Sequence, residues 1–151
     1  MAQPCLYPIF LDLAGKPVLV AGAGKVALRK ARGLLEAGAR VTVVAPRWEP
    51  EFEQLPVRLR KRAIRASDLR GARLVFTATD DRAVNHTIGR EARRRGIPVN
   101  VADAAEECDF LVPARVRRGS LQIAISTSGE SPREAVGWKR RIEEVLGSQN
   151  R

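Results

Sequence analysis

Apolar and polar residues follow one another along the chain in blocks that predict strands and helices in alternation. Residues 17–21 form a continuous apolar run that ends at glycine, which is typical of a strand buried on both faces. Apolar residues then recur at helical spacing as far as Ala37 and Gly38, which predict a helix C-terminus. A second buried strand is expected at residues 41–45, closed by Pro46. Strand, helix and strand in this order predict a right-handed crossover between parallel strands.

The same alternation continues as far as residue 101. The further elements expected are an edge strand at 57–61, a strand at 74–78, a helix at 82–95 that ends at Gly96, and a strand at 98–101. The pattern predicts an α/β fold with a Rossmann-type, doubly wound parallel sheet.

Beyond residue 110 the pattern changes. Residues 110–116 and 121–126 flank a turn at 117–120 and predict a β-hairpin. Ser131 is a candidate N-cap for a helix that runs through Leu146. The apolar face expected for this helix comprises Ala135, Val136, Trp138, Ile142, Val145 and Leu146. We expect residues 1–112 to form a nucleotide-binding domain and residues 113–151 a small segment that needs a partner surface.

Composition fits an ordinary globular protein. The chain has 151 residues, of which 44% are hydrophobic and 29% charged. It shows neither an apolar run of membrane-spanning length nor a basic, apolar leader at its start, and we expect a cytoplasmic protein. Cys5 and Cys108 lie far apart and are expected to be reduced, packed thiols. His and Cys residues show no metal-ligand spacing.

The net charge of +10 comes largely from arginine, because 22 Arg and 5 Lys stand against 17 acidic residues. Arginine binds carboxylates and phosphates through two parallel hydrogen bonds, so the excess favours nucleic acid, a nucleotide or a polycarboxylate as partner. The basic residues are scattered and lack interleaved aromatic residues, which argues against nucleic acid.

One motif carries recognisable chemistry. Gly22-Ala-Gly24-Lys-Val-Ala27 has the GxGxxA form of the dinucleotide-binding fingerprint and lies between a predicted strand and a predicted helix. The second strand, however, is followed by Pro46 and Arg47 instead of the acidic residue that usually holds the ribose. Either backbone groups near Ala45 and Pro46 hold the ribose, or Arg47 binds a 2′-phosphate.

Polar residues also follow the later strands, where open α/β sheets bind ligands. Asp103 is a candidate acid or base, although a turn or cap role is equally compatible with its position. Asp80 and Asp81 precede a helix, and at least one is expected to cap it. His86, the only histidine, is expected to be a surface or packing residue within that helix.

Several stretches together resemble the N-terminal region of siroheme synthases, the precorrin-2 dehydrogenase and sirohydrochlorin ferrochelatase family. The matching stretches include Tyr7-Pro-Ile-Phe10, Val20-Ala-Gly-Ala-Gly-Lys-Val-Ala27, Val41-Thr-Val-Val-Ala-Pro46, Ala78-Thr-Asp-Asp81, Val84-Asn85, Val99-Asn-Val-Ala-Asp103 and Ile123-Ala-Ile-Ser-Thr-Ser-Gly-Glu-Ser-Pro132. They extend over nearly the whole chain, which makes the resemblance far more specific than the glycine motif alone.

The resemblance implies an NAD-dependent oxidation of precorrin-2, a polycarboxylate tetrapyrrole, to sirohydrochlorin by a homodimer, without nucleic acid or membrane partners. Asp103 aligns with the catalytic aspartate of the family. The implied cofactor-binding residues are Gly22, Ala23, Gly24, Lys25, Val26, Ala45, Pro46, Arg47 and Thr79. The implied substrate-binding residues are Asn100, Arg115, Ser126, Thr127 and Ser128.

The chain also departs from the family. It is shorter at its C-terminus, and Ala104 stands where some members carry a second acidic residue. Both departures weaken the expectation of a second activity, insertion of Fe²⁺ as a substrate. The alternative function left open is a Rossmann-type nucleotide-sensing regulatory domain without catalysis.

Overall fold

The computed structural model describes residues 6–148 and divides the chain into two compact units. The sheet unit spans Phe10–Phe110, and the hairpin unit comprises residues 6–9 and 111–148. The prediction for Cys5 lies outside the described residues.

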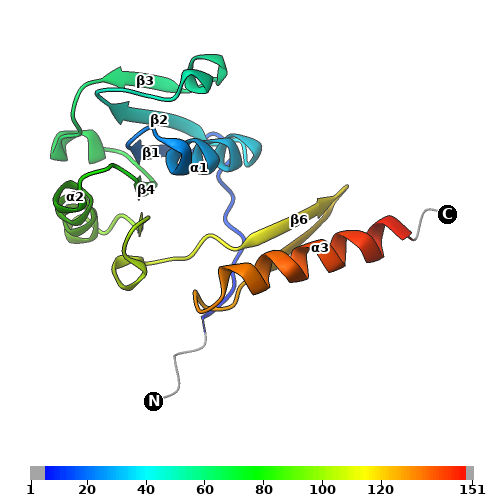
Figure 1. Cartoon of the computed structure of the whole chain (residues 1–151). Helices are drawn as coiled ribbons and strands as arrows, with labels where there is room; N and C mark the ends of the chain where they lie inside the picture. Colours follow the sequence, from blue (N-terminus) through cyan, green and yellow to red (C-terminus); the bar gives the residue numbers. More distant parts are fainter. Residues whose placement is uncertain (1–5, 149–151) are drawn as a thin grey trace. The chain divides into compact units, whose positions relative to one another are not determined.

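The sheet unit contains five parallel strands in the order β3-β2-β1-β4-β5. The strands are β1 (Pro17–Ala21), β2 (Arg40–Ala45), β3 (Arg58–Lys61), β4 (Leu74–Thr77) and β5 (Val99–Val101). This order confirms the doubly wound Rossmann topology, with β3 at an edge (Figure 1). Ala21 pairs with both Val44 and Thr77, and Thr77 pairs with Val101, so the carboxyl ends of these four strands lie along one edge.

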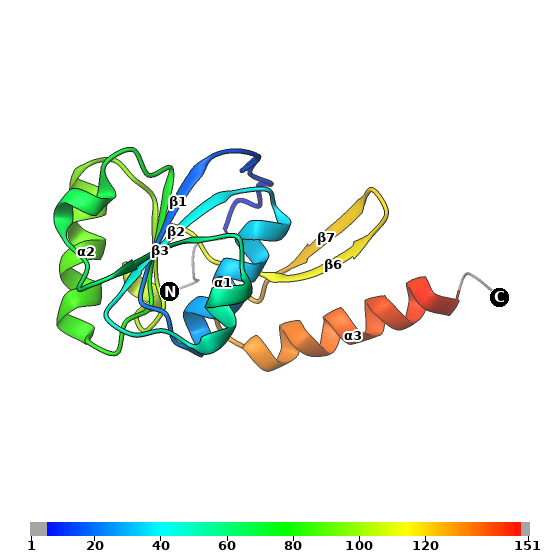
Figure 2. The same ribbon diagram turned by 90° about the horizontal axis from the view of Figure 1, so that it is seen from above.

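Two helices cover opposite faces of this sheet (Figure 2). Helix α1 (Lys25–Glu36) contributes Ala27, Ala31 and Leu34 to one buried cluster, and α2 (Arg82–Arg94) contributes Ile88 and Ala92 to another. Short 3₁₀ helices join the remaining strands: η1 (Pro50–Gln54), η2 (Ala66–Leu69) and η3 (Ala105–Glu107). The sheet therefore has an apolar core on both faces, as the continuous apolar runs predicted.

The predicted helix termini are also confirmed. Gly38 and Gly96 follow α1 and α2 with φ values of +75° and +69°, a conformation that glycine adopts without strain. The carboxylate of Asp81 accepts hydrogen bonds from the backbone N–H groups of Ala83 and Val84 at 2.8 and 3.2 Å, and so caps α2.

A buried carboxylate anchors the edge strand. Asp68 in η2, whose side chain is only 2% exposed, accepts hydrogen bonds from Arg60 of β3 at 2.7 Å and from Arg62 at 2.6 Å. It also accepts one from the backbone N–H of Arg65 at 2.9 Å. These bonds, those to Arg62 above all, lower the pKa of Asp68 to about 2.

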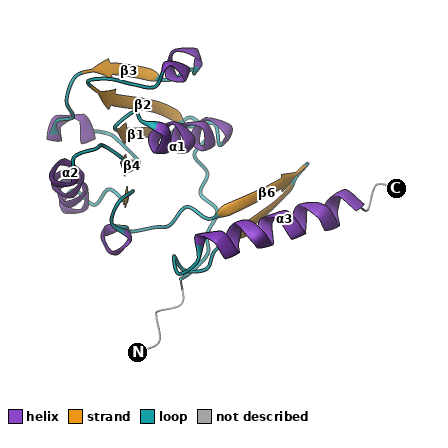
Figure 3. Cartoon of the chain, viewed as in Figure 1, coloured by secondary structure: helices purple, strands orange, loops and turns teal. Residues whose placement is uncertain are grey.

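The hairpin unit contains two antiparallel strands and one long helix (Figure 3). Strands β6 (Ala114–Arg118) and β7 (Leu121–Ile125) form the predicted hairpin, on which α3 (Pro132–Ser148) packs. The Ser131 hydroxyl accepts a hydrogen bond from the backbone N–H of Glu134 at 3.2 Å, which confirms the predicted N-cap. Among the helices of residues 6–148, none has the length and apolar character required to cross a membrane.

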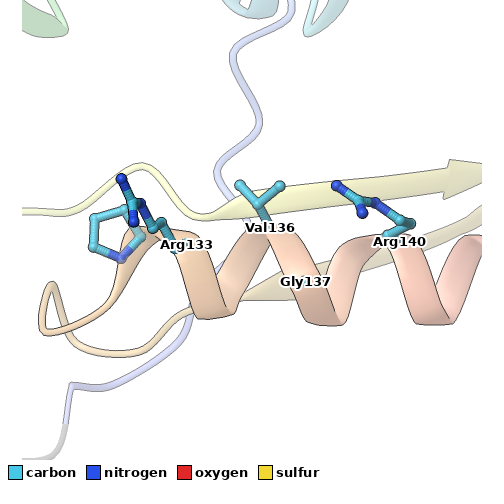
Figure 4. Close-up of a pocket in the computed structure, with 5 residues that line it drawn as sticks. Arg133, Val136, Gly137 and Arg140 are labelled. Carbon is cyan, nitrogen blue, oxygen red and sulfur yellow. The ribbon is translucent and has the colours of Figure 1, made fainter.

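The prediction that the apolar residues of α3 share one face is wrong for Val136. Ala135 is buried, whereas Val136 is half exposed and lines a surface pocket with Pro132, Arg133, Gly137 and Arg140 (Figure 4). Trp138 and Val145, also exposed, are seven residues apart and lie on a different face from Val136, because each residue advances the helix by about 100°. The helix therefore exposes apolar side chains on two faces.

Candidate functional site

The loop after β1 has a backbone that only glycine can form at Gly22. Its φ is +99°, and a Cβ placed there would lie 2.2 Å from the carbonyl oxygen of Ala78. The Gly22 N–H donates to the carbonyl oxygen of Val44 at 3.0 Å, which ties this loop to the end of β2. Gly22 thus makes the tight turn that the fingerprint requires at its first glycine.

Gly24, in the same loop, is exposed and has free space beside its Cα. It is the N-cap residue of α1, makes no side-chain capping bond, and has no atom within 4 Å of an added Cβ. Lys25 and Val26 are exposed in the first turn, while Ala27 is fully buried and permits close packing on the sheet. An uncapped helix N-terminus beside a glycine fits a pyrophosphate, since its N–H groups and dipole favour an anion.

The end of β2 lies beside this loop. Ala45 is buried, whereas Pro46 and Arg47 are exposed. The backbone N–H of Glu49 donates to the carbonyl oxygen of Ala23 at 3.0 Å. The structure thus joins the glycine loop to the segment predicted to hold the ribose. Glu49, an acidic residue a few positions beyond the strand, was not identified from the sequence.

The loop after β4 is held by a buried amide. Asn85 of α2 is 1% exposed, and its Oδ1 accepts hydrogen bonds from the backbone N–H and the hydroxyl of Thr79 at 3.0 and 2.7 Å. Its Nδ2 donates to the Thr79 carbonyl oxygen at 3.0 Å. Thr79 therefore lies in a fixed turn at the same sheet edge as the glycine loop.

Asp103 lies in the turn after β5. Asn85 Nδ2 also donates to Asp103 Oδ2 at 3.1 Å, and Arg82 Nε lies 4.0 Å from the same oxygen. The Asp103 side chain is 39% exposed, so it is open to a ligand. The cap of η3 is Ala104, and Asp103 is thus a turn residue whose carboxylate is held by α2.

A charged cluster lies next to Asp103. Glu107 accepts a hydrogen bond from the guanidinium of Arg82, and its carboxylate lies 2.9 Å from His86 Nδ1. The bond from Arg82 and then that from His86 lower the pKa of Glu107 to about 2, and Glu107 in turn raises the pKa of Arg82. His86 is exposed, as expected for a surface histidine.

Asn100, predicted to contact substrate, is committed to internal contacts. It is 5% exposed, accepts a hydrogen bond from Lys30 Nζ at 2.8 Å, and donates to the carbonyl oxygen of Phe110 at 3.0 Å. Burial lowers the pKa of Lys30. Cys108 Sγ accepts from the backbone N–H of Val101 at 3.2 Å, and burial raises the pKa of this free thiol, in agreement with the predicted packed cysteine.

The other residues predicted to bind substrate belong to the hairpin unit. Arg115 is exposed on β6. Ser126, Thr127 and Ser128 form the loop before α3, where Ser126 Oγ accepts from the backbone N–H of Ser128 at 3.1 Å and Thr127 Oγ1 donates to the Ser131 carbonyl oxygen at 3.0 Å. The three residues thus form one ordered loop, and Ser128 has a φ of +55°.

Comparison with family profiles identifies two matches. Residues 9–114 match the family described as "Putative NAD(P)-binding", and residues 118–144 match the central region of sirohaem biosynthesis proteins.

Known proteins extend this similarity over nearly the whole chain. The chain is 46% identical to a siroheme synthase of Methylococcus capsulatus over 146 residues, and 48% identical to one of Ectopseudomonas mendocina over 138 residues. These matches cover 94% and 90% of the chain but 31% and 30% of the two synthases, so the chain spans about a third of their length. Among solved structures, SirC, a precorrin-2 dehydrogenase, matches with a TM-score of 0.77 and 34% identity, over 97% of this chain and 72% of SirC.

Proposed function

Because the chain belongs to the NAD(P)-binding family of the siroheme synthases and SirC, we propose that it catalyses the NAD-dependent dehydrogenation of precorrin-2 to sirohydrochlorin in siroheme biosynthesis. The observation that carries this proposal is the similarity to SirC, since it extends over 97% of the chain and includes both units. The glycine loop and Asp103, which follow strands that end at one sheet edge, supply the local chemistry.

The sheet unit binds the cofactor. Gly24 and the exposed first turn of α1 hold the pyrophosphate, because a side chain at Gly24 would fill the space that the loop leaves open. Ala23, Lys25 and Val26 complete this loop, and Thr79 bounds the site after β4. When bound, NAD accepts the hydride that leaves the substrate.

Asp103 takes up the proton that the substrate loses with the hydride. Oxidation of precorrin-2 to sirohydrochlorin removes one hydride from carbon and one proton from the macrocycle, so a base must lie within reach of that proton. The carboxylate of Asp103 is partly exposed and held in place by Asn85, as a proton acceptor requires.

The substrate carboxylates are bound by arginine and hydroxyl side chains. Arg115 offers a guanidinium for a bidentate pair. Ser126, Thr127 and Ser128 offer hydroxyl and backbone donors from one ordered loop. Asn100 positions the end of β5, because its side-chain amide already accepts a hydrogen bond from Lys30 and donates one to the carbonyl oxygen of Phe110.

NAD is preferred to NADP. Backbone groups at Ala45 and Pro46 hold the adenosine ribose, and Arg47 lies against it without requiring a phosphate. A lower Kd for NADP than for NAD in a calorimetric titration would reverse this assignment and give Arg47 the role of a 2′-phosphate ligand.

The hairpin unit forms a homodimer with a second copy of the chain. Trp138 and Val145 are 48% and 62% exposed on one face of α3, and aromatic side chains of this kind contribute most to protein interfaces. We also propose that the enzyme acts in the cytoplasm, where it would draw on the cellular NAD pool.

The decisive experiment supplies the chain with NAD and precorrin-2 generated in situ. We expect equal amounts of NADH and sirohydrochlorin, both followed by absorbance. Tight NAD binding without turnover would overturn the proposal and favour a nucleotide-sensing domain. A separate reaction with sirohydrochlorin and Fe²⁺ tests chelation, and a rate no faster than in buffer would make the protein a dehydrogenase only.

A further inference from the structure

The amide of Asn85 makes every hydrogen bond of which an asparagine side chain is capable. Its Oδ1 accepts two bonds from Thr79, and its Nδ2 donates one to the Thr79 carbonyl oxygen and one to Asp103 Oδ2. The residue lies on the buried face of α2 with Ile88 and Ala92, where an apolar side chain would be expected. Burying an amide costs free energy unless its bonds are made, so this residue is held in a single arrangement.

The direction of these bonds is fixed by the backbone. The N–H of Thr79 can only donate, so the atom facing it at 3.0 Å must be the carbonyl oxygen of the Asn85 amide. The NH₂ group then faces the Thr79 carbonyl oxygen and the carboxylate of Asp103, both of which accept. Asn85 therefore donates to Asp103, and the reverse does not fit the contacts.

We propose that Asn85 is a positioning residue for Asp103: it binds Oδ2 and leaves Oδ1 as the oxygen that takes up the substrate proton. The inference rests on the proposed function for the role of Asp103. Among the contacts of residues 6–148, none involves Asp103 Oδ1, and more than a third of the Asp103 side chain is exposed to solvent. The same amide fixes Thr79, so one buried side chain aligns the cofactor loop with the acid or base.

The hydrogen-bond donor nearest to the Asp103 carboxylate is the neutral amide of Asn85, because the neighbouring arginine is bound to another carboxylate. Arg82 Nε lies 4.0 Å from Oδ2, too far for a hydrogen bond, because its guanidinium is bound to Glu107. Glu107 is also bonded to His86, and Glu106 adds a further negative charge near Arg82. A close arginine would strongly favour the ionised carboxylate and weaken it as a base, whereas an amide orients it with a smaller effect.

The first test compares Asn85→Ala and Asn85→Asp with Thr87→Ala, an exposed position on the same helix. We expect Asn85→Ala to lower kcat, measured under saturating NAD, roughly 10- to 100-fold. Asn85→Asp keeps the acceptor oxygen for Thr79 but places a second carboxylate beside Asp103. It should move the acid limb of the pH profile of kcat/KM upward by about one unit or more. An unchanged pH profile would overturn the proposal, because a purely structural role does not alter proton uptake.

The second test is a double-mutant cycle. If Asn85 acts through Asp103, Asn85→Ala should cost less than about twofold in an Asp103→Asn background. The same loss in both backgrounds would assign Asn85 to the Thr79 loop alone and overturn the proposal.

A third measurement needs no activity and guards against variants that fold poorly. Combining Asn85→Asp with Asp103→Asn reverses donor and acceptor, so the pair should regain part of the thermal stability that Asn85→Asp loses. The recovery is partial because the Thr79 carbonyl oxygen still lacks the donor that Asn85 Nδ2 supplied. No recovery would show that the two side chains do not interact. If wild-type protein fails to oxidise precorrin-2, the proposed function fails, and this stability coupling still tests the contact.

Discussion

The sheet unit and the hairpin unit differ in how completely each covers its apolar residues. The sheet has a buried cluster on each face, with Val20, Val43 and Val75 fully enclosed. In the hairpin unit, Val116 and Ala135 are buried, whereas Leu121, Val136, Trp138 and Val145 are exposed. The first unit therefore has the core of an independent fold, and the second has an apolar surface of the kind that binds a partner.

Under the proposed function, this difference separates the cofactor loop and Asp103 from the surface that would form the dimer. The glycine loop and Asp103 belong to the sheet unit, where rigid strands end and hold them in place. The exposed faces of α3 belong to the hairpin unit. Changes in the sheet unit should therefore alter cofactor binding or catalysis and leave assembly intact, and changes on α3 should do the reverse.

The largest effect is expected from Asp103→Asn. The variant is nearly isosteric and should lower kcat by ~10² to 10⁴, because it removes a positioned acid or base. The Kd for NAD and the oligomeric state should not change. Rate measurements under NAD saturation, with calorimetry and light scattering on the same sample, test all three. Retention of more than about a tenth of the wild-type rate would contradict the proton-transfer role.

Gly24→Asp should come next. The new side chain and its negative charge enter the space open to the pyrophosphate and oppose the favourable end of α1, so the Kd for NAD should rise at least about 100-fold. Gln122→Asp, an exposed position on β7, adds the same charge to the hairpin unit and should leave NAD binding unchanged. Equal NAD affinity in a folded Gly24→Asp variant would remove this loop from the cofactor site.

The parallel strands and the glycine loop could be predicted because their signals are local. A buried parallel strand gives a continuous apolar run, and the turn after β1 requires glycine at Gly22, where φ is +99°. The N-caps Asp81 and Ser131 were likewise recognisable from the residues that follow them.

The contacts that complete the site are long-range and were missed. Asn85 meets Asp103 across 18 residues, and Lys30 meets Asn100 across 70, so neither pair leaves a local pattern. One signal was present: Asn85 is a polar residue at helical spacing with Ile88 and Ala92 on an apolar stripe. The division of α3 into two exposed faces was also missed, because a list of apolar residues does not show which of them the hairpin covers.

On α3, the double substitution Trp138→Ser and Val145→Ser should weaken the dimer about 10- to 100-fold, with NAD affinity unchanged. Val136→Ser is the matched control, since Val136 lies on another face of the helix. Analytical ultracentrifugation over a range of concentrations measures both. A larger loss from Val136→Ser would move the interface to the face shown in Figure 4, and a monomeric wild type would contradict the proposed dimer.

The smallest effect concerns the stability of the sheet unit alone. Asp68→Asn removes the charge that Arg60 and Arg62 share at the edge strand, and should lower the free energy of unfolding by about 1 to 2 kcal/mol at pH 7. The folded pKa of Asp68, about 2, is below its ordinary value of 3.8. Its stabilisation is therefore complete above that ordinary value and is lost as the pH falls through about 2.

Urea unfolding of wild type and Asp68→Asn from pH 7 down to pH 2 tests this dependence, with Glu51→Gln as an exposed control in the same unit. The difference between wild type and Asp68→Asn should shrink as the wild-type carboxylate itself becomes protonated, while the control differs little from wild type at any pH. Because Asp68 lies entirely within the sheet unit, dimer affinity at pH 7 should not change. A stability difference that persists undiminished at pH 2 would mean that packing around η2, and not the charge of Asp68, anchors β3.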